Sequence, residues 1–322
     1  MAWEGAFGIA PKEAHNCVMS GAFVVYELNR ERIDEKFLDF FFKVPDHWQG
    51  VGRQSTGTNV RRQSLHPNQF EQAEIPLPPL AEQGRLVARI EELAAQIREA
   101  RSIRAETETK VEVLRSKVMD GLFQLFSDKR VPIGSAFRVT TGGTPSRGNP
   151  AYWDGDVKWV SSGEVAFCRI RDTAEKITEL GVAESNAKVY PPQTVLIAMI
   201  GQGKTRGQCA ILDCHAATNQ NVAGIHVYAT EHLPEFVYWW LFFNYQQSRS
   251  TEIGTAQPAL SGERVKQMLI PLPSPADQRR IVAELDGLRA EIDALKRLQT
   301  ETAAELNALL PAILDKAFKG EL

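Results

Sequence analysis

The stretch EIPLPPLAEQGRLVARIEELAAQI at residues 74–97 returns as LIPLPSPADQRRIVAELDGLRAEI at residues 269–292. The two stretches align without a gap at an offset of 195 residues, from Glu74 to Leu269. The same offset still holds far downstream, where it pairs Leu114, Val118, Asp120 and Phe123 with Leu309, Ile313, Asp315 and Phe318. Chance similarity does not keep its register over such a length, so the chain contains an internal duplication.

Each copy begins with a proline-rich stretch, residues 75–79 and 270–273, that cannot lie inside a helix. Apolar residues then recur at alternating spacings of four and three, which is typical of a coiled-coil seam with charges outside it. The seam residues are Leu86, Ile90, Leu93, Ile97, Ala100, Val111, Leu114, Val118 and Leu125 in the first copy, and Ile281, Leu285, Leu288, Ile292, Leu295, Leu306, Leu309 and Ile313 in the second. The pattern predicts two long helices, at 76–127 and 269–322.

Polar residues interrupt both seams at equivalent positions, Arg104 and Thr107 in one copy and Gln299 and Thr302 in the other. Polar residues in matching layers fix the register of paired helices. We therefore expect the two helices to pair antiparallel along the whole seam, with these four residues close together. Two unrelated helices facing solvent are the alternative, but they leave the matched interruptions unexplained.

Between the helices, residues 128–268 have the mixed pattern of an α/β domain. Strands are expected at 156–160, 194–200, 208–212 and 222–227, and an aromatic-rich helix or buried segment at 233–245. Residues 1–75 resemble the rear half of such a domain, since EKFLDFFF at 35–42 parallels PEFVYWWL at 234–241. Nothing in the first copy matches 130–197, so we expect it to lack its front half, roughly 70 residues by the repeat. The fold class is predicted as α+β, with mixed α/β domains joined by two long helices that form an antiparallel coiled coil.

The composition is that of a soluble globular protein, with 322 residues, 43% apolar and 24% charged. No apolar stretch is long enough to cross a bilayer, and no signal peptide is evident, so we expect no membrane association. The four cysteines, Cys17, Cys168, Cys209 and Cys214, form no CxxC pair. They predict free thiols in the cytoplasm. Cys209, Cys214 and His215 make a poor zinc site, so no metal site is expected.

The formal net charge of −3 argues weakly against a nucleic-acid binder. However, no acidic residue lies between Asp46 and Glu71, or between Glu184 and Asp213, although both stretches contain basic residues. DNA phosphates respond to local positive charge on a protein surface rather than to the net charge of the chain, so DNA binding by these stretches remains an alternative. Lightly charged core segments explain them equally well.

Short motifs border the repeated parts. GGTPSRGNPAYWDGDVKWVSSGEV occupies 142–165, IPLPPLAEQ and IPLPSPADQ begin the two helices, and FKGEL ends the chain at 318–322. Together with the alternation of domain and long helix, they resemble the specificity subunits of type I restriction-modification systems. The segments then correspond to a partial first target recognition domain (1–75), a first conserved helix (76–127), a complete second recognition domain (128–268) and a second conserved helix (269–322).

The resemblance implies a non-catalytic subunit that reads a bipartite site in double-stranded DNA. It also implies docking of DNA methyltransferase subunits, with a restriction (translocase and nuclease) subunit as a further partner. S-adenosylmethionine, ATP and magnesium are then bound by the partners, and no cofactor is expected in this chain. The missing front of the first domain puts in doubt whether both halves of a site are read.

One motif favours a different class of protein. AMIGQGKT at 198–205 fits a loose phosphate-loop pattern and follows an expected strand, as in a nucleotide-hydrolysing enzyme. Such a loop opens a helix, whereas RGQCAILDC, which follows here, has the pattern of a strand. The loop is then a basic, glycine-rich DNA contact or a purely structural hairpin. NPAY at 149–152 resembles the amino-methyltransferase motif without its second proline, and a turn explains it better. No catalytic residue is assigned.

Polar clusters remain as candidate DNA contacts, because amides can pair with adenine edges and guanidinium groups can grip guanine or phosphate. The candidates are Thr58, Asn59, Arg61, Arg62, Ser161, Ser162, Gln202, Lys204, Thr205, Arg206, Asn219, Gln220 and Asn221. For each residue, capping or turn formation is the alternative. A coiled-coil scaffold that does not read DNA is the competing function.

Overall fold

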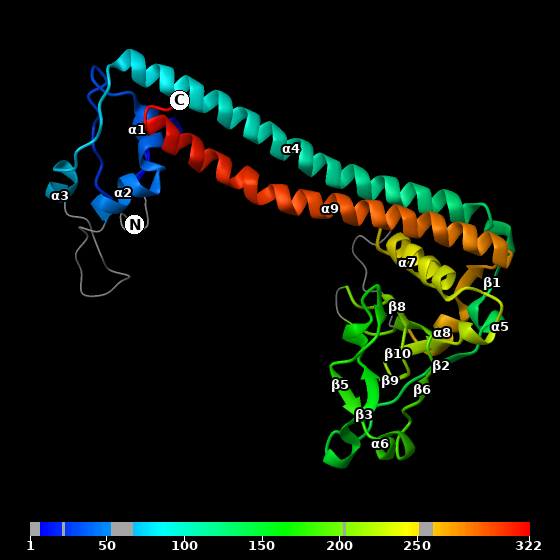
Figure 1. Ribbon diagram of the computed structural model, residues 1–322. Coiled ribbons are helices and arrows are strands. Elements are labelled where there is room, and N and C mark those ends of the chain that lie inside the picture. The colour runs from blue at the N-terminus through cyan, green and yellow to red at the C-terminus, as the bar shows by residue number, and fades with distance from the viewer. Residues whose placement is uncertain (1–6, 21–22, 53–66, 202–203, 251–259) are drawn as a thin grey trace. The chain divides into compact units, whose positions relative to one another are not determined.

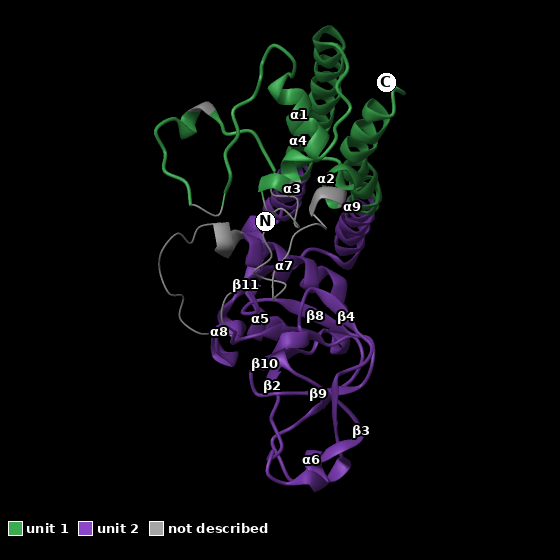
Figure 2. Cartoon of the chain, turned by 90° about the vertical axis from the view of Figure 1, so that its left-hand side faces the viewer, with its two compact units in different colours: residues 1–109, 294–322 green, residues 110–293 purple. Residues whose placement is uncertain are grey.

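The computed structural model describes residues 7–20, 23–52, 67–201, 204–250 and 260–322. Two compact units emerge: unit 1 comprises 1–109 and 294–322, and unit 2 comprises 110–293 (Figure 2). Two long helices, α4 (Leu80–Gln124) and α9 (Pro275–Phe318), contribute to both units (Figure 1). The predicted helices are therefore present. The domain boundaries and the partial nature of 1–75 remain predictions.

Unit 2 is built on two sheets. Its elements are β1 (Arg130–Pro132), α5 (Ile133–Ala136), β2 (Val139–Thr141), β3 (Trp153–Val160), β4 (Cys168–Ile170), β5 (Glu175–Ile177), α6 (Glu179–Ala183), β6 (Val189–Tyr190), β7 (Val195–Ala198), β8 (Cys209–Leu212), β9 (Ala216–Thr218), β10 (Val222–Ile225), α7 (Pro234–Ser250), α8 (Gly262–Gln267) and β11 (Leu269–Pro271). One sheet has the order β2-β10-β7-β8-β4 and the other β5-β3-β9-β6, while β1 pairs with β11. All four predicted strands and the aromatic helix are found, which confirms the α+β class.

The central strands of the five-stranded sheet are buried on both faces. Side chains of a strand alternate between its two faces. Val195 and Ile197 of β7 accordingly belong to the cluster that contains α7, whereas Leu196 and Ala198 belong to a second cluster with Tyr190 of β6. The sheet therefore lies between α7 and residues of the four-stranded sheet, and its strands read as continuous apolar runs.

In unit 2, α7 packs on the last turns of α4 and the first turns of α9. Phe123 of α4 is completely buried. Its ring meets Phe236 at 5.9 Å and Trp240 at 5.2 Å between centroids, both edge to face. Ile281 and Leu285 of α9 join the same core.

Unit 1 contains the short helices α1 (Glu35–Phe42), α2 (Pro45–Gly52) and α3 (Pro67–Glu71). In its core, α1 packs on the opposite ends of the long helices, the start of α4 and the end of α9. Phe318 of α9 meets Phe37 at 5.3 Å and Phe41 at 5.4 Å, again edge to face. The offset of 195 residues relates Phe318 to Phe123, so the duplication repeats this contact.

The long helices run antiparallel in unit 1. Arg101 donates to Asn307 at 2.9 Å and Arg104 donates to Thr302 at 3.1 Å, so positions rise along one helix as they fall along the other. Arg104 also donates to the carbonyl of Gln299. Thr107, in contrast, donates to Ile103 of its own helix at 2.7 Å. The structure thus brings together three of the four expected register residues.

The predicted seam is wrong at three positions. Leu114, Leu125 and Leu309 are 55%, 67% and 45% exposed. Leu125 lies beyond the end of α4. At Leu114 and Leu309, a straight helix drifts about 20° per heptad against a spacing of 3.5 residues, so a seam extrapolated over many turns leaves the buried face. The buried positions at the unit 2 end of α4 are instead Met119, Leu122 and Phe123.

Candidate nucleic-acid interface

The residues predicted to contact DNA fall into three groups in the structure. Thr58, Asn59, Arg61, Arg62 and Gln202 lie outside the described residues. Lys204, Thr205 and Arg206 follow β7, and Asn219, Gln220 and Asn221 connect β9 to β10. Ser161 and Ser162 follow β3.

The glycine-rich loop joins two antiparallel strands, β7 and β8. Gly207 donates to Ala198 at 2.8 Å and Ala198 donates to Gln208 at 2.9 Å, which closes a hairpin. Gly207 has φ +85°, a backbone conformation that favours glycine. A Cβ there would also lie 3.2 Å from the ring of Tyr245, so the space at this position favours glycine as well. Because the loop leads into a strand, it presents no helix N-terminus to a nucleotide. The nucleotide-hydrolysing alternative is therefore not favoured.

The turn between β9 and β10 uses only some of its polar groups internally. The side chain of Asn219 is 9% exposed and accepts from the amide of Asn221 at 3.0 Å, which makes it a turn-forming residue. Gln220 is exposed and Asn221 half-buried, and Gln220 accepts a hydrogen bond from Thr144. The amide of Met199, at the end of β7, donates to the carbonyl of Asn221 at 2.8 Å. The structure thus places the turn beside the start of the hairpin loop.

A family model, the type I restriction modification DNA specificity domain, matches residues 129–304. The chain belongs to this family. The EcoKI specificity subunit of Escherichia coli (strain K12) is 23% identical over 99% of this chain and 73% of its own length. The MjaIX specificity subunit of Methanocaldococcus jannaschii is 29% identical over 46% of this chain and 34% of its own.

Solved structures of the family share the fold. The HsdS subunit from Thermoanaerobacter tengcongensis superposes with a TM-score of 0.65 at 24% identity, covering 91% of this chain and 72% of that one. A structure of a type I R-M system, described for its complex assembly and conformational transition, gives a TM-score of 0.66 at 25% identity over 91% and 73%. The long helices and mixed sheets are thus features of type I specificity subunits.

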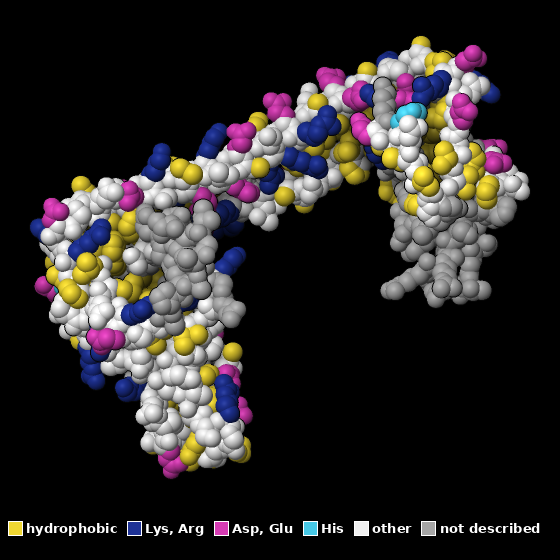
Figure 3. Space-filling view, turned by 180° about the vertical axis from the view of Figure 1, so that it is seen from behind, with side chains coloured by type: hydrophobic (Ala, Val, Ile, Leu, Met, Phe, Trp, Pro, Cys, Tyr) yellow, Lys and Arg dark blue, Asp and Glu magenta, His cyan; other side chains and the backbone are white. Residues whose placement is uncertain are grey.

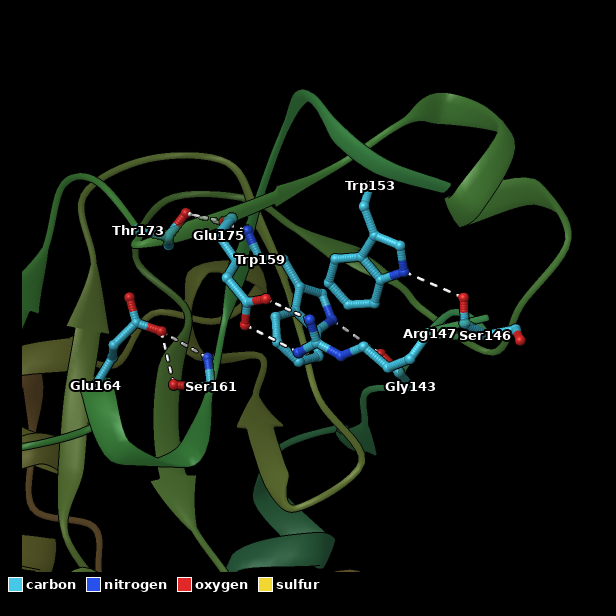
Figure 4. Close-up of polar contacts among 9 residues, drawn as sticks. All are labelled: Gly143, Ser146, Arg147, Trp153, Trp159, Ser161, Glu164, Thr173 and Glu175. Atoms are coloured by element: carbon cyan, nitrogen blue, oxygen red, sulfur yellow. Dashed lines mark hydrogen bonds and ion pairs between the residues drawn. The ribbon is translucent and has the colours of Figure 1, made fainter. Parts of the chain in front are cut away.

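Ser161 of this specificity subunit has a local structural role. Its amide and its hydroxyl both donate to Glu164 Oε2 at 2.8 Å, forming a capping box over the 3₁₀ turn that follows β3 (Figure 4). The other oxygen of Glu164 accepts from the amide of Ala174 at 3.0 Å. These contacts agree with the capping alternative for Ser161, and a DNA contact by Ser161 or Ser162 stays a prediction.

The loop that opens the specificity domain is held by a cluster that the sequence did not predict. The guanidinium group of Arg147 lies 3.7 Å from the ring centroid of Trp153 and 5.2 Å from that of Trp159, and it pairs with both oxygens of Glu175 (Figure 4). The indole of Trp153 donates to Ser146 and that of Trp159 to Gly143, each at 3.1 Å. Hydrogen bonding raises the pKa of Arg147 and lowers that of Glu175, so the pair stays charged.

This cluster sets the loop against the β9–β10 turn. A Cβ at Gly142 would lie 2.1 Å from the carbonyl oxygen of Thr218, and one at Gly143 would lie 2.4 Å from the backbone of Asn186. Only glycines allow that approach. Thr144, the next residue, then reaches Gln220. The loop therefore contacts the turn, and the turn lies beside the start of the hairpin loop.

Other kinds of site receive no support from the described parts of the chain. No described helix is both long enough and apolar enough to cross a membrane. Among the same residues, His, Cys, Asp and Glu side chains form no group of three or more that could hold a metal ion.

Proposed function

We propose that this chain is the DNA-specificity subunit of a type I restriction-modification complex and carries out no catalytic step itself. The observation that carries the proposal is the family match over 129–304, which covers the mixed domain of unit 2 and much of α9. Relatives that align with nearly the whole chain are named specificity subunits of type I restriction enzymes. Its function is to recognise a bipartite DNA sequence for partner subunits.

We assign half-site reading in unit 2 to the β7–β8 hairpin loop and the β9–β10 turn. The first connects strands of the five-stranded sheet and the second connects the four-stranded to the five-stranded sheet. Recognition residues concentrate on such connections between rigid strands. The exposed amide of Gln220 and the half-buried amide of Asn221 suit adenine edges. Lys204 is exposed and suits a phosphate. Asn219, whose carbonyl oxygen is used within the turn, supports this surface from behind.

The long helices provide the docking surface for methyltransferase subunits in this proposal. Ile103 and Leu298, which the duplication relates, are 57% and 58% exposed, and the related pair Leu114 and Leu309 is also exposed. Hydrophobic side chains lie between charged ones on the visible face of these helices (Figure 3). Equivalent apolar positions on both helices suit two copies of one partner. A restriction subunit is a further partner, and S-adenosylmethionine, ATP and magnesium are bound by the partners in the cytoplasm.

The test is DNA binding by the chain assembled with its methyltransferase subunits. Gln220→Ala and Asn221→Ala should each cost about 1–3 kcal/mol on the target duplex and leave a scrambled duplex unaffected. Lys204→Ala should weaken both duplexes equally and lower the salt slope by about one. Lys176→Ala on β5 serves as the control cation, since Lys176 is exposed on a strand remote in sequence from loop and turn. Absence of target preference in the wild-type complex would overturn the function.

A further inference from the structure

Unit 2 distributes its carboxylates unevenly. Residues 129–153, 185–212 and 214–230 contain no Asp or Glu, and these spans supply β2, β6, β7, β9 and β10. Several other surface cations of the unit pair with carboxylates, and one of them, Arg147, lies in the first of these spans and pairs with Glu175. Arg169 pairs with Asp213 and Glu235, and Lys158 lies 3.5 Å from Asp172. The strands without acidic residues therefore border a region of unbalanced positive potential.

Two of those strands, β2 and β6, meet at a seam between the two sheets. β2 is an edge strand of the five-stranded sheet and β6 is an edge strand of the four-stranded sheet. The hydroxyl of Tyr190 on β6 donates to the carbonyl of Thr140 on β2 at 3.3 Å. Gly224 makes room for this contact, because a Cβ there would lie 2.7 Å from the Tyr190 ring. The seam is thus a built, tightly packed junction.

A chain of hydrogen bonds leads from the seam to the surface. The hydroxyl of Thr140 lies 2.8 Å from His226 Nε2, and His226 Nδ1 lies 2.9 Å from the hydroxyl of Tyr228. The hydroxyl of Thr140 donates its one proton to the Tyr190 oxygen at 3.2 Å, so Nε2 carries the imidazole proton and donates to Thr140, while Nδ1 accepts from the Tyr228 hydroxyl. Tyr228, which is 43% exposed, therefore uses its own O–H within this chain of hydrogen bonds.

Two cations flank this chain of hydrogen bonds. Arg138 immediately precedes β2, and its carbonyl accepts from the amide of His226 at 2.9 Å; Lys188 immediately precedes β6. Both side chains are exposed, and within the described ranges neither has a carboxylate partner. Burial lowers the pKa of His226, and the positive charges of Arg138 and Lys188 lower it further. The positive charges of Arg138 and Lys188 therefore both act at His226.

We propose that Arg138 and Lys188 form a phosphate-binding pair for the DNA backbone. The inference rests on the proposed function and adds a contact surface that the sequence did not predict. A backbone phosphate suits it better than a base edge, because two unpaired cations present donors only. The β9–β10 turn lies along the same strands, since β10 connects Asn221 to His226. Phosphate contacts here would hold the DNA in register for that turn.

The experiment measures binding of target and scrambled duplexes to the assembled complex at several salt concentrations. Arg138→Gln and Lys188→Gln, which keep side-chain bulk, should each weaken binding to both duplexes and lower the salt slope by about one, and the double variant by about two. Tyr228→Phe should leave both affinities and the slope close to wild type, because the O–H that it removes is donated to His226 and not to DNA. Lys176→Gln, the matched control, should match wild type.

The outcomes separate this inference from the proposed function. If Arg138→Gln and Lys188→Gln keep the wild-type slope while the wild-type complex still prefers its target, the phosphate pair is refuted and the function stands. Equal losses in the two variants and in Lys176→Gln would also refute it, since they would indicate net charge alone. Failure of the wild-type complex to bind its target would contradict the function itself.

Discussion

Helix α1 in unit 1 and helix α7 in unit 2 attach to the long helices through the same contacts, but at different depths. Phe123 and Phe318 are related by the duplication, and each places two aromatic rings of the short helix edge to face. Phe123 is 0% exposed because the sheet core continues behind it, whereas Phe318 is half-buried in a small cluster. The duplication thus conserved the joint, which is the packing of the short helix on the aromatic residue of the long helix. The neighbouring sheet determines how much that joint stabilises its unit.

A buried glutamine completes each joint. Gln83 and Gln278 are both 0% exposed. Gln83 accepts from the amide of Asp34 at 2.8 Å, and Gln278 accepts from that of Leu233 at 2.9 Å, in each case just before the short helix begins. Each also donates to a proline carbonyl at the start of its own long helix, Pro78 at 2.7 Å and Pro273 at 2.9 Å. The motif that marks the repeat in sequence is therefore a hydrogen-bonded clamp.

The largest expected effect tests the difference in depth. Phe123→Ala should destabilise unit 2 by about 3–5 kcal/mol, because it leaves a cavity in a fully buried core. Phe318→Ala should cost unit 1 less, because that ring is already partly hydrated. Hydrogen exchange of α7 and α1 amides measures each unit separately, which matters in a chain of two units. An equal or larger loss for Phe318→Ala would contradict the comparison.

The next largest effect is expected at high pH, where the stability of the α7 joint should fall and that of the α1 joint should not fall for the same reason. Burial raises the pKa of Tyr238 in α7 to about 12, against 10.0 for an ordinary tyrosine, whereas the matched position of α1 is Asp39. The unfolded chain ionises this hydroxyl above pH 10 while the folded chain keeps its proton. Stability present below pH 10 is therefore lost between about pH 10 and 12, by roughly 2–3 kcal/mol for two pK units. Tyr238→Phe should flatten this loss at α7. Parallel curves for wild type and variant would refute it.

The duplication made much of the fold predictable, because it located both long helices at an offset of 195 residues and α1 and α7 at an offset of 199. The seam failed at Leu114 and Leu309 because small periodic errors accumulate along a helix. Within the candidate site, the hairpin was predictable from the strand pattern that follows GQGKT. The Arg147–Glu175 pair and the Arg138–Lys188 surface were not, since their residues are far apart in sequence and only tertiary packing, of a loop on β5 and of one sheet on the other, brings them together.

Loss of either glutamine clamp should destabilise its own unit by a similar amount. Gln278→Leu leaves the Leu233 amide without its acceptor and should destabilise unit 2 by about 1–3 kcal/mol. Gln83→Leu should do the same to unit 1 through Asp34. Gln96→Leu, on the exposed face of α4, is the control and should stay within about 0.5 kcal/mol of wild type. Urea unfolding followed by exchange in each unit provides the measurement. A loss confined to one unit would show that the clamps are not equivalent.

The smallest effect is expected at Trp240, where the matched residue of unit 1 is Phe41. The indole nitrogen of Trp240 is buried and has no hydrogen-bond acceptor among the described residues. Trp240→Phe removes apolar contact but also removes an unsatisfied donor, whose burial costs about 1–3 kcal/mol. The two terms oppose each other, so the net change should stay within about 1 kcal/mol. Trp239→Phe is the matched control, because the neighbouring indole donates to Asp286 at 2.9 Å and loses a real bond. The urea midpoint should therefore fall further for Trp239→Phe than for Trp240→Phe. The reverse order would mean that the joint of unit 2 requires the indole of Trp240, at a position where unit 1 has only a phenylalanine.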